Sequence, residues 1–453
     1  MLPSQPWGRS VTEVEDQIQR VLIANRGEIA RRLIRHYAQR DVETAVVFSA
    51  ADADQSYLDD CDYPVYLPAR SVSETYLDPQ RVVAAALDAG CDAVHPGYCF
   101  LAEHLGFYEA ARGANLPVIG APAAVLPNVV DRPRLFQVAR GLGIPLIPHS
   151  ASVPLEDDGS ASAAMVGMPL FVKAVHGKVM VHAPTASALP QALQDARARS
   201  LIETGDAEVY LEREVETARQ IGVVIAADRH GTCVCLGVTD DSLELHYCTW
   251  VEEVGKVVEP SLLERLSEAS VRLAEAVRWV GIGTVRWAVG PSGGWYLLGF
   301  SARLTTGFNV VEAVQGVDLL DAQSTALFGG ALGWEASVPE RHGIQARIFH
   351  IDPRTGLRPP GTLEGLELPE DCEVDVGLDV ASVCDGDTEP LIAKLTVTAP
   401  TRQAAIVRMR AALERTQVVG VESNLQVLRK LFGHPDVWAH GADVGTLRDL
   451  LGT

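Results

Sequence analysis

The chain has 453 residues, a formal net charge of −21, and a content of 47% hydrophobic and 21% charged residues. Its length is enough for roughly two to four domains, and its composition is typical of a soluble globular protein without a run of the roughly 20 apolar residues that cross a bilayer. The acidic balance argues against a nucleic-acid partner and against docking on an anionic membrane, since both require a basic surface, so we expect a cytoplasmic protein.

The first 120 residues alternate the patterns of strands and helices. The segment 79–90 has the pattern of a helix, and short apolar runs predict strands at 21–25, 44–49, 92–97 and 117–120. This strand–helix–strand order favours an α/β fold with a parallel, doubly wound sheet. Ligands of such sheets bind at the carboxyl ends of the strands, which directs attention to the turns after Asn25 and His95.

The rest of the chain divides into further units. A helical connector at 130–142 precedes a boundary rich in Pro, Gly and Ser, and the residues from about 147 to 216 have the pattern of a small α/β lid. Strands and helices alternate again toward the C-terminus. We therefore predict four segments, namely an N-terminal extension (1–20), a doubly wound domain (21–128), a lid-and-body domain (129–330) and a C-terminal α+β domain (331–453).

Two motifs point to a known family, IANRGEIA at 23–30 and HPGYCFLAE at 95–103. Shorter segments extend the likeness, namely FVKA (171–174), RIFHIDP (347–353), LIAKL (391–395) and GVESNLQVL (420–428). In this combination the chain resembles the biotin carboxylase family of the ATP-grasp superfamily over nearly its whole length. The resemblance implies an N-terminal biotin carboxylase domain, an ATP-grasp lid and body, and a C-terminal biotin carboxylase domain. It also implies that MgATP and bicarbonate give carboxyphosphate, which carboxylates biotin on a carrier.

Several positions that the resemblance assigns to the nucleotide are retained. Lys173 stands on the lid strand, Glu212 at the adenine side, and Arg132 replaces a second lysine of the family. The phosphate loop is short and keeps one glycine, Gly177, followed by Lys178, which could offer charge to a phosphate. A backbone cradle for phosphate needs residues that adopt positive φ, so we predict a plain hairpin turn at this loop.

The positions that the resemblance assigns to metal ions are changed most. The two metal-binding glutamates of the family fall on Arg286 and Gly299, and their asparagine partner falls on Ser301. Mg²⁺ beside a triphosphate needs anionic oxygen ligands, which a guanidinium and a bare backbone do not supply. We therefore predict no metal site and assign no cofactor, with ATP as the ligand that the resemblance implies. Arg286 is expected to pair with a local carboxylate or to reach solvent.

The bicarbonate site that the resemblance implies is half retained. Arg303 and Arg347 remain at the substrate-arginine positions, where a fork of N–H donors could still bind an anion. The glutamate that acts as the family's base falls on Gly307, and Thr305 and Thr306 replace the residues that line the anion. The alternative role for the two arginines is ion pairing within the fold.

The interpretation we favour is a catalytically impaired biotin-carboxylase-like subunit with a structural or regulatory role in an acyl-CoA carboxylase-type complex. Metal ligands, base and phosphate loop together supply the electrostatic preorganisation on which phosphoryl transfer depends, and all three are altered. The expected partners are an active biotin carboxylase paralogue, a biotin carrier or a carboxyltransferase subunit, in a homo- or hetero-oligomer.

Two alternatives stay open. The first is an active ATP-dependent biotin carboxylase, a ligase, that uses substitute acids near the presumed site. The candidates for these acids are Glu252, Glu253 and Glu312. The second is a metal-independent nucleotide sensor. Its phosphate-binding charges would be Lys173, Lys178, Arg132 and Arg286.

Overall fold

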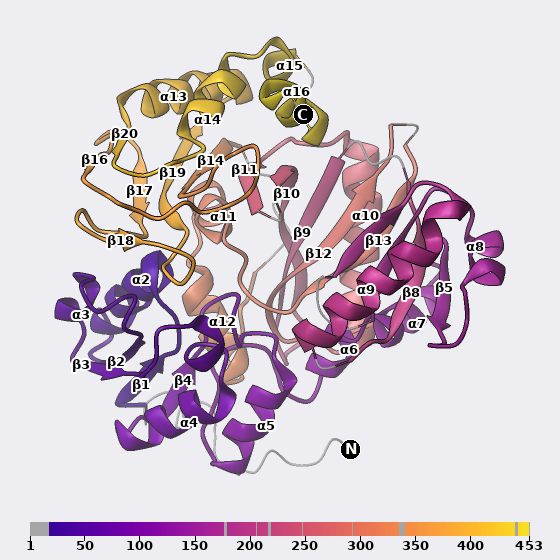
Figure 1. The fold of residues 1–453 in the computed structure, drawn as a ribbon. Helices are drawn as coiled ribbons and strands as arrows, with labels where there is room; N and C mark the ends of the chain where they lie inside the picture. The colour runs from indigo at the N-terminus through magenta and orange to yellow at the C-terminus, as the bar shows by residue number, and fades with distance from the viewer. Residues whose placement is uncertain are drawn as a thin grey trace.

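The structure is a computed structural model with the predicted α/β architecture (Figure 1). The residues that it describes are 18–175, 179–204, 206–215, 219–246, 248–291, 293–334, 340–439 and 443–452. The predicted N-terminal extension therefore lies almost entirely outside the described residues, as do Gly177 and Lys178. No helix among the described residues is long and apolar enough to cross a membrane.

The N-terminal part contains the predicted parallel sheet. In the described part of the chain it has four strands in the order β3-β2-β1-β4. These strands are β1 (Arg20–Ile23), β2 (Glu43–Phe48), β3 (Tyr63–Tyr66) and β4 (Ala93–His95). The helices around them are α2 (Gly27–Ala38), α3 (Tyr57–Asp60), the 3-10 turn η1 (Val72–Glu74), α4 (Pro79–Asp88) and α5 (Leu105–Gly113).

The prediction of a strand at 117–120 is wrong, because this segment forms only an isolated bridge in which Val118 pairs with Val94. The fourth strand is β3, which the sequence did not reveal. Its four residues include Pro64 and are mostly exposed. Proline and exposure are both typical of an edge strand, which lacks the apolar run that identifies a central strand.

A second, larger sheet forms the centre of the molecule. Among the described residues it has eight strands in the order β13-β12-β9-β10-β11-β14-β19-β17, and all neighbours are antiparallel. They are β9 (Arg219–Ala227), β10 (Cys233–Leu245), β11 (Cys248–Val254), β12 (Gly281–Val289), β13 (Trp295–Ser301), β14 (His342–Phe349), β17 (Glu373–Val376) and β19 (Leu391–Ala399). Since β11 pairs with β14, the sheet continues across the predicted domain boundary near residue 331.

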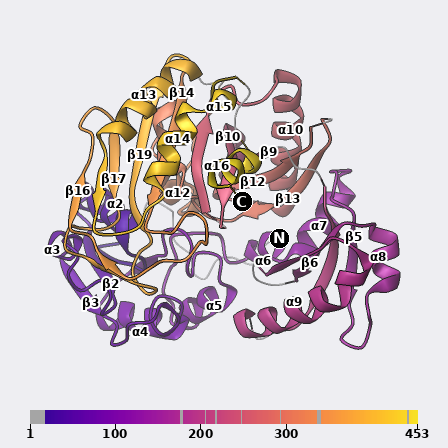
Figure 2. The same cartoon turned by 45° about the horizontal axis from the view of Figure 1, so that its top comes forward.

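The predicted lid stands apart from the rest of the chain at the right of both views (Figures 1 and 2). Its strands are ordered β5-β8-β6-β7, and they enclose an apolar cluster of their own with two helices. The strands are β5 (His149–Val153), β6 (Leu170–Ala174), β7 (Met180–Ala183) and β8 (Val209–Arg213). The helices are α8 (Ser160–Val166), the 3-10 turn η2 (Ala186–Ala188) and α9 (Leu189–Thr204).

The remaining helices cover the central sheet and join the parts. In the middle of the chain they are α6 (Leu126–Val130), α7 (Arg132–Gly141), α10 (Pro260–Val277), α11 (Phe308–Gln315) and α12 (Leu319–Leu327). The C-terminal part contributes α13 (Arg402–Arg415), α14 (Leu425–Gly433), α15 (Pro435–Ala439), α16 (Val444–Leu451) and the short strands β15 (Gly361–Thr362), β16 (Gly365–Glu367), β18 (Val383–Cys384) and β20 (Gln417–Val419). A buried hydrogen bond of 3.0 Å from Trp287 Nε1 to Ser270 Oγ fixes α10 on β12.

A buried ionic cluster joins three parts of the chain. Lys394 on β19 has no exposed surface, and its Nζ lies 2.9 Å from Glu28 Oε1 on α2 and 3.9 Å from Asp375 Oδ2 on β17. It also donates to Asn309 on α11. Burial raises the pKa of Glu28 to about 7, although the charge of Lys394 opposes this shift. One lysine therefore neutralises acids from the N-terminal and C-terminal parts of the chain.

Candidate functional site

The two altered metal positions lie side by side on the central sheet. Arg286 on β12 pairs in register with Gly299 on β13, and Ser301 lies further along the same hairpin, opposite Thr284. The structure thus brings together the positions where the resemblance places metal ligands. What they present is one guanidinium and one open stretch of backbone, since a Cβ on Gly299 would meet no atom within 4 Å.

The guanidinium of Arg286 is held by the neighbouring strands. Its Nη2 donates to Gln220 Oε1 at 2.9 Å on β9 and lies 3.3 Å from Glu244 Oε2 on β10. This arrangement confirms the expectation that Arg286 pairs with a local carboxylate. The negative charge of Glu244 thus balances the positive charge of Arg286. This partner is not predicted from the sequence, because it lies 42 residues away in the chain.

Arg347 on β14 is buried, and its charge is matched within the chain. Its Nη2 donates to Glu252 on β11, while its Nη1 donates to the Thr249 carbonyl and its Nε to Gln345, both at 3.2 Å. Burial raises the pKa of Glu252, and the charge of Arg347 opposes that shift. The arginine expected to bind an external anion is therefore occupied by a carboxylate of the same chain.

The carboxylate of Glu252 also fills the space beside Gly307. A Cβ built on Gly307 would overlap the carboxyl group of Glu252. Residue 307, where the resemblance places the family's base, is thus a glycine without a side chain. The carboxylate of Glu252 from β11 occupies the adjacent space. Glu252 is predicted from the sequence as a substitute acid, but its place beside residue 307 depends on the strand order.

Arg303 lies in the loop after β13 and pairs with the N-terminal part of the chain. Its Nε donates to Glu103 Oε2 at 2.9 Å, and its Nη1 donates to the Leu304 carbonyl at 3.0 Å. The other oxygen of Glu103 accepts the backbone N–H of Ala302 at 2.6 Å. Glu103 is the last residue of the HPGYCFLAE motif, so this motif contributes to the site through its acid. Sequence reasoning did not single out that residue.

The residues that the resemblance assigns to the nucleotide lie close together, and their side chains contact one another. Lys173 on β6 forms an ion pair with Glu212 on β8. The Tyr210 hydroxyl lies 3.4 Å from Glu212 Oε2 and accepts a hydrogen bond of 3.1 Å from Arg132 Nη1. Burial lowers the pKa of Lys173, and the charge of Glu212 opposes the shift. Tyr210 had no role in the sequence-based prediction, although it lies two residues from Glu212 on the same face of the strand.

The prediction that three substitute acids lie near the site is wrong for two of them. Glu253 follows Glu252 on β11 and faces the opposite side of the sheet, as alternation along a strand requires. It accepts hydrogen bonds from His342 Nε2 at 2.9 Å and from Arg402 Nε at 2.7 Å. Glu312 on α11 accepts a hydrogen bond of 2.8 Å from the backbone N–H of Leu319, so its carboxylate is engaged at the start of α12 and not beside Glu252.

A further acid of the site, Asp241, is not predicted from the sequence. It lies within a register shift of the β10–β11 pairing, between Asp240 and Leu243, and such a bulge redirects a side chain in a way that alternation alone does not predict. Its Oδ1 is buried without a hydrogen-bond partner in the described part of the chain. Burial and the charge of Glu252 raise the pKa of Asp241 to about 8, while Arg286 and Arg347 oppose this shift.

Replacing Asp241 by Asn is expected to stabilise the protein at alkaline pH. The pKa of Asp241 is raised from 3.8 to about 8, so the folded state holds this proton more tightly, and its contribution to stability falls as the pH rises through that window. The neutral amide removes this loss, and we expect a gain of about 1 kcal/mol or more at pH 8. Urea unfolding at pH 4 and pH 8 measures it; an equal gain at both values would contradict the assigned cause.

Comparisons with known proteins identify the family over nearly the whole chain. Models described as "Biotin carboxylase, N-terminal domain", "Carbamoyl-phosphate synthase L chain, ATP binding domain" and "Biotin carboxylase C-terminal domain" match residues 17–126, 131–332 and 345–449. Biotin carboxylase 2 of Bacillus subtilis (strain 168) is 31% identical over 419 residues, which cover 90% of this chain and 94% of that protein. The methylcrotonoyl-CoA carboxylase subunit alpha of Mus musculus is 29% identical over 430 residues, which cover 92% of this chain and 60% of that longer protein.

Solved structures agree with this relationship. The biotin carboxylase–βγ-ATP complex of Campylobacter jejuni matches with a TM-score of 0.89 at 27% identity, over 96% of this chain and 99% of that one. The biotin carboxylase domain dimer of Hydrogenobacter thermophilus 2-oxoglutarate carboxylase, solved with MgADP, ADP and bicarbonate, also gives 0.89, at 26% identity over 95% and 97% of the two chains. Because sequence and fold agree over all three parts, this chain belongs to the biotin carboxylase family and has its ATP-grasp architecture.

Proposed function

We propose that this protein is a catalytically impaired subunit of an acyl-CoA carboxylase-type complex, with a structural or regulatory role. One observation supports the proposal above all. Four cations at the positions predicted to bind ligands are each ion-paired with an acid of the same chain. The pairs are Lys173–Glu212, Arg286–Glu244, Arg303–Glu103 and Arg347–Glu252.

These internal pairs compete directly with the ligands of the family reaction. A triphosphate would have to displace Glu212 from Lys173, and its metal ion would have to bind beside the guanidinium of Arg286. An anion at Arg347 would have to displace Glu252, which would then be a buried charge without its partner, a state that typically costs several kcal/mol. Catalysis by electrostatic preorganisation requires groups that are aimed at the substrate beforehand, and here they are aimed at each other.

The proposed partners follow from the names of the relatives. The mouse relative is a subunit of a methylcrotonoyl-CoA carboxylase, and a 30% identical relative from Mycobacterium leprae (strain TN) is the alpha3 subunit of a biotin-dependent acyl-coenzyme A carboxylase. The Hydrogenobacter structure is a dimer of biotin carboxylase domains. We accordingly propose an active biotin carboxylase, a biotin carrier or a carboxyltransferase subunit as the partner in a homo- or hetero-oligomer.

Calorimetric titration with ATP, with and without Mg²⁺, tests the proposal. We expect no saturable heat of binding up to about 1 mM ATP, with or without Mg²⁺. A Kd of about 1 mM corresponds to a binding free energy of roughly −4 kcal/mol. An active biotin carboxylase measured in parallel shows that the nucleotide is competent. Bicarbonate-dependent ATP hydrolysis that disappears in Lys173→Met would contradict the proposal, because only a working site would depend on that lysine.

A second candidate function is favoured by the place of Glu252. A carboxylate with a raised pKa beside Arg347 could accept a proton from a bound anion, as a general base does. In that case the protein would be an active ATP-dependent carboxylase in which Glu252 takes the role of the family's base. Loss of bicarbonate-dependent hydrolysis in Glu252→Gln would support it. The metal-free nucleotide sensor is tested by the titration without Mg²⁺.

A further inference from the structure

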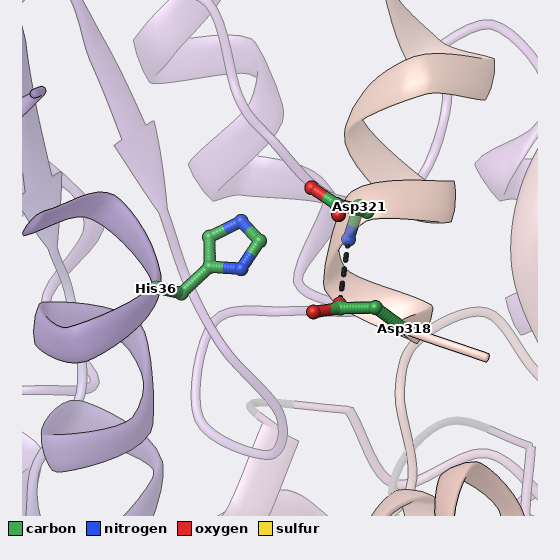
Figure 3. Close-up of side chains that lie close together, drawn as sticks. All are labelled: His36, Asp318 and Asp321. Atoms are coloured by element: carbon green, nitrogen blue, oxygen red, sulfur yellow. Dashed lines mark hydrogen bonds between the residues drawn. The ribbon is translucent and has the colours of Figure 1, made fainter. Parts of the chain in front are cut away.

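Outside the candidate site, three side chains with metal-binding groups converge where α2 meets α12. His36 projects from α2, Asp318 immediately precedes α12 and Asp321 lies in its first turn. One ligand atom from each residue lies within 4.8 Å of the others. Figure 3 shows the imidazole directed at the two carboxylates across the space between the helices.

The imidazole of His36 lies largely inside the protein and is free to bind a ligand. The residue is 4% exposed, and no hydrogen bond joins either ring nitrogen to another of the described residues. A neutral imidazole offers a lone pair to a metal ion.

The two carboxylates are oriented by hydrogen bonds that leave one oxygen of each available. Asp318 Oδ1 accepts the backbone N–H groups of Leu320 and Asp321, both at 3.0 Å, as the cap of α12. Asp321 Oδ1 accepts a hydrogen bond from Arg40. Outer contacts of this kind fix the ligand carboxylates of metal sites and tune their charge.

Space for further ligands adjoins the cluster. A cavity of about 290 Å³ is lined by His36 and Asp318 together with Arg32 and Arg35 of α2, Gln39 just after it, and three residues of β17. Water or a small anion in this cavity could complete the coordination of an ion held by three protein ligands. Three protein ligands with an open position are typical of zinc sites that bind an additional ligand.

We propose that His36, Asp318 and Asp321 form a binding site for a borderline divalent cation, with Zn²⁺ as the preferred ion, that links α2 to α12. An imidazole with two carboxylates suits Zn²⁺ and Co²⁺, whereas Mg²⁺ prefers oxygen ligands and water. Arg40 and Arg32 lie beside the carboxylates and weaken the attraction for a cation, so we expect the affinity to be lower than that of a structural zinc finger. The site does not depend on the proposed function.

Titration of the untagged full-length chain with Zn²⁺, after removal of metal by a chelator, tests the site. We expect one saturable ion per chain and a rise in Tm of ~2 °C or more in excess Zn²⁺. His36→Gln should weaken binding by at least about tenfold, which is the smallest effect expected from loss of a ligand. His182→Gln is the control, because His182 is exposed on the lid, where it contacts Glu214 and the ring of Phe171 and lies outside the cluster.

Asp321→Asn is a second variant that should fold normally even if His36→Gln does not, because the Asp321 side chain is half exposed. It should also weaken Zn²⁺ binding, and the Co²⁺ absorption spectrum of the wild type should show nitrogen and oxygen ligands without thiolate bands. Unchanged affinity in both His36→Gln and Asp321→Asn would overturn the proposal. So would an absence of saturable Zn²⁺ binding, or a Co²⁺ spectrum dominated by thiolate bands.

Discussion

Lys394→Met should destabilise the folded protein by about 3–5 kcal/mol, the usual effect of removing one partner from a buried ion pair. Methionine fills a similar volume, so lost packing contributes little. The loss arises because Glu28 and Asp375 remain in the interior without the ammonium that lies 2.9 Å and 3.9 Å from them. Urea unfolding at pH 8 measures the effect.

The size of this loss should depend on pH with a defined sign. The pKa of Glu28 is raised from 4.5 to about 7, so the folded state binds this proton more tightly than the unfolded state. Its contribution to stability therefore falls as the pH rises between these values. Without Lys394 the pKa of Glu28 rises further, and the loss continues above pH 7. The deficit of the variant should be small at pH 4.5 and largest at pH 8.

Two comparisons isolate the cause. Lys430→Met removes a lysine from the exposed face of α14 and should change stability by no more than about 0.5 kcal/mol. Adding Glu28→Gln to Lys394→Met removes the unpaired charge from α2 and should recover part of the loss. A deficit in Lys394→Met that is the same at all pH values would show that shape, and not charge, determines the contribution of Lys394.

Gly307→Ala should destabilise the folded protein by about 3 kcal/mol. The new methyl group would overlap the carboxyl group of Glu252, which would have to leave both its space and its partner Arg347. Overpacking and the separation of a buried pair each destabilise by a few kcal/mol. Chemical unfolding of the purified variant measures the loss.

The matched control is Gly299→Ala, at the other glycine that stands where the resemblance places a glutamate. A Cβ there meets no atom within 4 Å, so the variant should be as stable as the wild type or slightly more stable, because Ala loses less entropy than Gly on folding. In a Glu252→Ala background, Gly307→Ala should cost less than about 1 kcal/mol. If the two changes were additive, the carboxylate of Glu252 would not occupy the space beside residue 307.

The sequence predicts the sheets of this protein better than it predicts the partners of their side chains. Apolar runs locate β1, β2 and β4, because burial and turn residues are local properties. The expectation that Arg286 finds a nearby acid is also confirmed, since Glu244 Oε2 lies 3.3 Å from its guanidinium. The identity of that acid, Glu244, depends on which strands are neighbours, and the order of strands in the central sheet is not a local property.

The errors have similar causes. Glu252 and Glu253 are adjacent in sequence and look equivalent, but strand alternation sends them to opposite faces, and the sequence does not tell which face is the site. The bulge that directs Asp241 inward leaves no mark in composition. β3 was overlooked because an edge strand can be polar and contain proline without loss of a buried hydrogen bond.

The continuity of the central sheet across residue 331 limits how this chain can be dissected. A fragment ending there would lose β14 and expose the backbone N–H and C=O groups of β11 along the segment 251–254. An unpaired strand edge recruits other strands, so such a fragment is an aggregation hazard rather than a free-standing unit. Truncation studies should keep β11 and β14 in one fragment and remove the lid instead. Among the described residues, the strands of the lid pair only with one another.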